Sequence, residues 1–118
     1  MADVQSMSHR VTSDLAVVEC RRAVERYRHR GDLTDEGTVM CLEVLAEMLD
    51  SFDVMEMNPQ ILRRASERLP TELATLDAIH LASALLYRDE RGAAPALATH
   101  DAALARAARL MGLRVIGV

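Results

Sequence analysis

The stretch TLDAIHLASALL (residues 75–86) is typical of an apolar helix that carries an aspartate, Asp77, in its first turn. It is followed by ALATHD (residues 96–101), in which a short apolar strand leads into Asp101 and the start of another helix. In parallel α/β sheets, ligands bind beyond the carboxyl ends of the strands, where the next helices begin. The two stretches therefore predict an α/β fold with a candidate acidic site at one edge of its sheet.

The rest of the chain alternates between helical and strand patterns in the same way. Ser13, Thr34 and Asn58 each precede an apolar periodic segment, as helix caps do. Gly31 and Gly112 follow such segments, where glycine commonly ends a helix. The pattern predicts strands over residues 11–13, 52–57, 97–98 and 113–118, and helices over residues 14–30, 34–50, 59–69, 75–88 and 101–111.

Strands that are separated by helices pair in parallel, because a parallel partner needs a crossover connection. The predicted order is therefore a parallel sheet with helices on both faces. At 118 residues the chain is long enough for one hydrophobic core. We expect a single domain over residues 1–118.

The charge and composition argue against a general nucleic-acid-coating protein and reveal one basic segment. Half of the residues are hydrophobic and the net charge is −4, so the chain is not a protein whose main task is coating nucleic acid. All fourteen basic residues are arginines. Five of them, Arg21, Arg22, Arg26, Arg28 and Arg30, crowd one predicted helix, which is either a solvated face or a surface that follows phosphates.

The cysteines and the absence of a long apolar run indicate the cellular compartment in which the protein works. Cys20 and Cys41 lie in helical patterns without Cys-x-x-Cys spacing, so we expect small buried hydrophobic residues in a reducing environment. The first ten residues are polar, unlike a signal peptide. No apolar run approaches the roughly 20 residues that span a bilayer. We expect a soluble cytoplasmic protein with no membrane contact.

Three carboxylates are candidate functional groups, and each also has a structural explanation. Asp77 falls at the second helical position if Thr75 is the cap, where it stabilises the helix dipole by roughly 0.3–1 kcal/mol. Asp101 is placed to cap its helix or to lie in the first turn. Glu19 is placed to pair with Arg22, worth roughly 0.2–0.5 kcal/mol.

Together, the three acids indicate a metal site. Carboxylates that lie close together repel, and a divalent cation relieves the repulsion. Mg²⁺ and Mn²⁺ prefer such oxygen ligands. His80 and His100 lack zinc-ligand spacing, and no Gly-rich phosphate loop or serine-hydrolase motif is present.

Three stretches resemble the PIN domain, and most of all the VapC-type toxins of toxin–antitoxin pairs. VTSDLAVVE (residues 11–19) resembles the strand and helix that end in the family's second acidic residue. LDAIHLASAL (residues 76–85) resembles the helix that carries the third acid. ATHDAALARAARLMGL (residues 98–113) resembles the strand and helix with the last acid. The likeness runs over about residues 11–118 and implies a three-layer α/β/α fold.

The resemblance implies a metal-dependent endoribonuclease that hydrolyses RNA with Mg²⁺ or Mn²⁺. Glu19, Asp77 and Asp101 would be its catalytic metal ligands, and Thr99 would place a hydroxyl beside them. Members of this family are usually homodimers that a cognate antitoxin inhibits.

The chain departs from the family pattern at its amino terminus. The family's first strand, which ends in its first acidic residue, has no counterpart, and Asp3 does not replace it because no apolar strand precedes it. We therefore expect a PIN-like domain without its N-terminal strand. Two alternatives stay open: an inactive module that binds an antitoxin or a homologous toxin, and an unrelated α/β domain whose acids are all helix caps.

Overall fold

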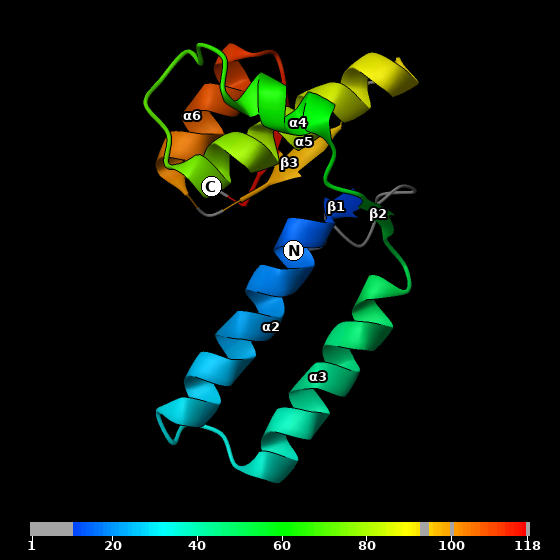
Figure 1. Cartoon of the computed structure of the whole chain (residues 1–118), viewed down its shortest axis with the longest axis vertical. Helices are drawn as coiled ribbons and strands as arrows, with labels where there is room; N and C mark the ends of the chain where they lie inside the picture. Colours follow the sequence, from blue (N-terminus) through cyan, green and yellow to red (C-terminus); the bar gives the residue numbers. More distant parts are fainter. Residues whose placement is uncertain (1–10, 93–94, 100, 118) are drawn as a thin grey trace. The chain divides into compact units, whose positions relative to one another are not determined.

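The order of helices and strands agrees with the sequence prediction. The computed structural model describes residues 11–92, 95–99 and 101–117 (Figure 1). Its elements are β1 (Val11–Ser13), α2 (Asp14–His29), α3 (Asp35–Leu49), β2 (Asp53–Met55), α4 (Pro59–Ala65), α5 (Thr75–Arg91), β3 (Ala96–Ala98), α6 (Ala102–Leu110) and β4 (Arg114–Ile116).

The described residues divide into two compact units, one ending at Glu56 and one beginning at Met57. Each unit contains one pair of parallel strands. In the first unit, β1 pairs with β2 in the register Val11↔Asp53. In the second, β3 pairs with β4 in the register Ala96↔Arg114. The α/β fold and the parallel pairing are confirmed, although the described strands form two two-stranded sheets instead of one continuous sheet.

The predicted caps are confirmed for four of the five helices. The side chains of Ser13, Thr34, Asn58 and Asp101 each accept a hydrogen bond from the backbone N–H three residues later, at 3.2, 2.9, 2.9 and 2.8 Å. Short polar side chains do this because the first backbone N–H groups of a helix have no partner within it. The cap of α5 is Ala74 and not Thr75, so this helix has no side-chain cap.

Several boundaries differ from the prediction. α4 ends at Ala65, four residues early, and an irregular connection over residues 66–74 follows it. α5 continues to Arg91, where Gly92 takes a left-handed backbone (φ 70°) that favours glycine and ends the helix. β2 is limited to three residues. Propensity alone places such ends poorly, because tertiary packing decides how far each helix extends.

The second unit holds the main hydrophobic core. Leucines and alanines of α5 and α6 pack together with Leu113, which directly precedes β4 (Arg114–Ile116). The buried cluster comprises Leu81, Leu85, Leu104, Ala107, Ala108 and Leu113. The guanidinium of Arg88 ties the same two helices together, because its Nη1 donates a hydrogen bond of 2.6 Å to the carbonyl of Met111 at the end of α6. This contact satisfies a terminal carbonyl that the helix itself cannot.

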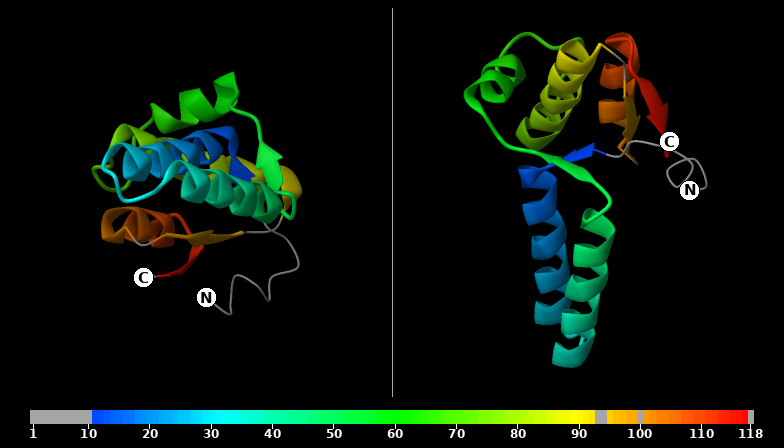
Figure 2. Two further views of the ribbon diagram at one scale, coloured as in Figure 1. Left: turned by 90° about the horizontal axis from the view of Figure 1, so that it is seen from below. Right: turned by 90° about the vertical axis from the view of Figure 1, so that its right-hand side faces the viewer.

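The first unit is a hairpin of two helices, α2 and α3, which lie side by side in both views (Figures 1 and 2). α2 contains no buried residue, so the expectation that Cys20 is buried is wrong: Cys20 is exposed, and Cys41 is half-buried. A helix packed along one side only leaves most of its surface in solvent. Four large apolar residues of α3 are also exposed by 51–64%: Val39, Met40, Val44 and Met48.

No helix within the described ranges is long and apolar enough to cross a membrane. Residues 1–10, where the resemblance implies that a first strand is missing, lie outside the described part of the chain.

The buried cluster predicts which leucines hold the second unit together. Leu85 is fully buried, so Leu85→Ala should lower the free energy of unfolding by about 2–5 kcal/mol through lost burial and the cavity left behind. Leu110 is 59% exposed, and Leu110→Ala should change stability by no more than about 0.5 kcal/mol. Urea unfolding followed by circular dichroism measures both. Equal effects would show that the cluster is not the core.

Candidate acidic site

Asp77 lies in the first turn of α5 and is half-buried. Because Ala74 is the cap, Asp77 is the third helical residue and not the second. Its carboxylate faces the positive end of the helix dipole, which favours an acid there. The helix has no side-chain cap, and Asp77 is the acidic residue in its first turn.

Asp101 caps α6 and is exposed. Its Oδ1 accepts a hydrogen bond from the backbone N–H of Leu104 at 2.8 Å. Its own backbone N–H donates to Oγ1 of Thr99 at 3.0 Å. The cap bond uses one carboxylate oxygen, so Oδ2 remains available to another ligand. Of the two placements considered from sequence, the cap is the one observed.

The segment that carries Asp101 is held against the end of β4. The backbone N–H of Thr99 donates to the carbonyl of Ile116 at 3.0 Å and extends the pairing of β3 with β4 by one bond. Gly117 lies against the same residue: a Cβ at Gly117 would sit 2.8 Å from the carbonyl oxygen of Thr99. The φ of Gly117 is 97°, a backbone conformation that favours glycine. Both the close contact and the backbone conformation therefore require glycine at this position. Thr99 is therefore placed by backbone contacts.

The first turns of α5 and α6 lie at one end of the second unit, the end at which β3 finishes (Figures 1 and 2). The chain direction explains this placement. α5 and α6 both run antiparallel to β3, so their amino ends return to the carboxyl end of that strand. Asp77 and Asp101 thus belong to the edge of the sheet where α/β proteins bind ligands.

Glu19 lies on α2 in the first unit and is half-buried. Within each unit, the described residues form no group of three His, Cys, Asp or Glu side chains that would hold a metal ion. The site of Glu19, Asp77 and Asp101 therefore stays a prediction. His80 is half-buried on α5, and His100 lies outside the described residues.

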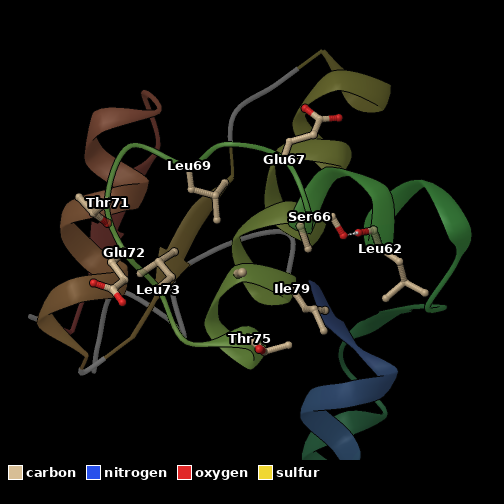
Figure 3. A pocket seen from close by; sticks show the side chains of 11 residues that line it. Leu62, Ser66, Glu67, Leu69, Thr71, Glu72, Leu73, Thr75 and Ile79 are labelled. Atoms are coloured by element: carbon tan, nitrogen blue, oxygen red, sulfur yellow. Dashed lines mark hydrogen bonds between the residues drawn. The ribbon is translucent and has the colours of Figure 1, made fainter.

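A cavity of about 520 Å³ lies beside the first turn of α5 (Figure 3). Its wall combines α4, the connection over residues 66–74 and the first turns of α5, with Thr75 and Ile79 on the helix side. Oγ1 of Thr71 is buried there without a hydrogen-bond partner in the described part of the chain. Neither Asp77 nor Asp101 lines it. Sequence patterns did not predict this cavity, because an irregular connection forms one side of it.

The sequence and the fold agree with a known family. The PIN domain model matches residues 2–110, and the chain belongs to the PIN-domain family. It is also 35% identical over 107 residues to Ribonuclease VapC46 of Mycobacterium tuberculosis (strain ATCC 25618 / H37Rv), a match that covers 91% of this chain and 72% of that relative. The resemblance to VapC-type PIN proteins is therefore confirmed.

The cap bond of Asp101 predicts that the stability of the protein depends on a hydrogen-bond acceptor at this position and not on its negative charge. Asp101→Ala removes the acceptor for the Leu104 N–H and should cost about 0.5–2 kcal/mol of stability. Asp101→Asn keeps an equally good cap and should stay within about 0.5 kcal/mol of the parent. Thermal unfolding of the three proteins tests this. An Asn variant as unstable as the Ala variant would show that the charge, not the cap bond, is what stabilises α6.

Proposed function

We propose that this chain is a metal-dependent endoribonuclease, a VapC-like toxin of a toxin–antitoxin pair. In this proposal Glu19, Asp77 and Asp101 hold Mg²⁺ or Mn²⁺ and form the catalytic site. The observation that carries it is the placement of Asp77 and Asp101 at one strand end of a PIN-family domain. The similarity to a protein named as a ribonuclease supports RNA as the substrate.

The donor atoms suit a hard divalent cation. The candidate residues offer carboxylate oxygens, with the hydroxyl of Thr99 beside Asp101, and contain no thiolate. Oxygen donors of this kind favour Mg²⁺ or Mn²⁺ over zinc. Once bound, such a cation lowers the pKa of a coordinated water and offsets negative charge on a phosphodiester. The residues therefore fit the group that the family implies.

The protein side chains have separate tasks in this proposal. The Leu104 N–H binds Oδ1 of Asp101, and the Thr99 hydroxyl accepts from the backbone N–H of Asp101, so both the backbone and the carboxylate of this residue are positioned. Asp77 and Glu19 supply the remaining negative charge. Ligands that are already fixed lose little conformational entropy when they bind a cation or position a water.

Partners follow from the same family. We propose that a cognate antitoxin inhibits the protein, that it forms a homodimer, and that it acts in the cytoplasm. The exposed apolar residues of α3 favour protein contacts, because clusters of exposed apolar side chains commonly mark interaction surfaces.

The same surface supports the alternative function. A catalytically inactive PIN-like module that binds an antitoxin or a homologous toxin needs the exposed face of α3 and does not need the acids. The two functions differ in one result: whether the purified chain cleaves RNA.

Cleavage of RNA is the first test. The 118-residue chain should cleave single-stranded RNA with Mn²⁺ or Mg²⁺ and should lose this activity in EDTA. Asp77→Asn and Asp101→Asn should each lower the rate by at least about 100-fold, because each removes a charged ligand of the cation. Gel analysis of a fluorescent RNA measures the rate. The matched control is Asp89→Asn, at an exposed carboxylate that pairs with Arg64.

Inactivity of the parent chain in every metal would contradict the nuclease and leave the binding module as the better function. Equal loss of activity in Asp89→Asn would show that the site is wrongly assigned.

Metal binding gives a second test that is independent of turnover. A cation that binds only the folded state stabilises it by about 2.7 kcal/mol at 100 times its Kd. Mn²⁺ should therefore raise the melting temperature of the parent, and Asp77→Asn combined with Asp101→Asn should abolish the rise. An unchanged melting temperature would favour an α/β domain whose acids act only at helix ends.

A further inference from the structure

One segment of the acidic chain is strongly basic. Residues 21–30 hold five arginines against one glutamate, a balance of +4, and the other nine arginines stand against seventeen acids, a balance of −8. Most of this segment belongs to α2. The contrast shows that positive charge is concentrated on one element of an otherwise negative molecule.

Arg22, Arg26 and Arg30 lie along one line of this helix, and we call them the arginine stripe. Residues four positions apart share a helix face, and Arg30 keeps a right-handed helical backbone as the cap residue. Each step rises about 6 Å along the axis. All three side chains are exposed. This step is similar to the spacing of successive phosphates along an extended single strand.

The stripe has little internal compensation. Glu25 is the acid within this stretch, and it is bound by Arg28 at 2.9 Å and lies 3.6 Å from His29. The hydrogen bond from Arg28 holds the pKa of the Glu25 carboxyl below its usual value, so this acid stays charged and paired with Arg28. The ion pairs of Glu25 are with Arg28 and His29, and the charge of Arg22 is a smaller contribution to the lowered pKa of Glu25.

Helix stability does not explain all three cations. The helix dipole favours positive charge only in the last turn, which accounts for Arg26 and Arg30. Arg22 lies in the middle of α2, beyond that effect, and its spacing of three residues from Glu19 and Glu25 contributes only about 0.2–0.5 kcal/mol per pair. Like charges four residues apart repel and weaken the helix by a few tenths of a kcal/mol per pair. The stripe thus carries two repulsive pairs that a polyanion would relieve.

We propose that the arginine stripe of α2 binds the phosphate backbone of single-stranded RNA without reading its sequence. Guanidinium groups bind phosphate oxygens through two parallel hydrogen bonds, and backbone contacts position a strand without specifying its bases. The identity of the polyanion as RNA rests on the proposed function. The stripe consists of residues other than the proposed metal ligands Glu19, Asp77 and Asp101.

An exposed aromatic residue beside the stripe favours RNA over an anionic lipid surface. Tyr27 is 52% exposed and lies three residues before Arg30, on the neighbouring part of the helix surface. Basic grooves with exposed aromatics bind single strands because bases stack on the rings. A membrane-bound helix instead needs a broad apolar face, and the large apolar side chains that α2 exposes are Val18 and Tyr27.

The test measures binding without cleavage. A short fluorescent single-stranded RNA is titrated with the full chain in EDTA at several KCl concentrations, and anisotropy gives the association constant. Replacing the stripe by Arg22→Gln, Arg26→Gln and Arg30→Gln should reduce the slope of log K against log salt by about 2, since each phosphate contact on a single strand contributes about 0.7. Glu25→Gln should tighten binding, because it frees Arg28.

A matched variant controls for net charge. Arg63→Gln, Arg106→Gln and Arg109→Gln remove the same three charges from exposed positions of α4 and α6. This variant should keep the parent slope. Tyr27→Leu should weaken binding on the order of tenfold with little change in slope, because stacking is lost and charge is not. Circular dichroism of each variant, expected to match the parent, separates loss of contacts from loss of structure.

The results separate this proposal from the nuclease. Asp77→Asn should bind RNA with the parent slope. Stripe-dependent RNA binding by the parent chain, without cleavage in any metal, would overturn the nuclease and leave the stripe in place. Equal slope losses in the two triple variants would overturn the stripe. Unchanged RNA binding in the stripe variant, with loss of binding to phosphatidylserine vesicles, would also overturn it and assign α2 to a lipid surface.

Discussion

The pairing of β3 with β4 is the constraint on which the candidate site depends. It continues past the strands through the bond from Thr99 to Ile116, and Gly117 approaches too closely for any larger residue. Asp101 lies two residues beyond Thr99 and caps α6. The buried leucines and alanines of α5 and α6 then hold the two helix starts at the same end of the unit. A carboxylate is thus positioned by backbone contacts that many side-chain changes would leave intact.

The acids illustrate how one side chain serves structure and proposed chemistry together. A helix start needs an acceptor for its first N–H groups and favours negative charge. Beyond the end of a parallel strand, the same carboxylate also faces the ligand edge of the sheet. Structural and functional explanations of Asp77 and Asp101 are therefore compatible. In α2, by contrast, the exposed cations of the stripe exceed what helix stability requires.

The helix and strand order followed from local chemistry, and so did most helix starts. Ser13, Thr34, Asn58 and Asp101 cap because short polar side chains meet N–H groups a few residues away, which is a contact set by sequence spacing alone. α5 begins at Thr75 as predicted, but its cap escaped prediction because Ala74 leaves no such signal. Cys20 was predicted as buried because periodicity shows which residues share a face but not whether anything covers it.

The sequence by itself determined the α/β class, the parallel pairing of strands and the family, because these depend on periodicity, caps and short motifs. Tertiary structure decided where α4 and α5 end, how closely Thr99 meets Gly117, and that a cavity forms beside the irregular connection after α4. Those features arise from contacts between residues distant along the chain. Local propensity contains no information about them, and only packing in three dimensions resolves them.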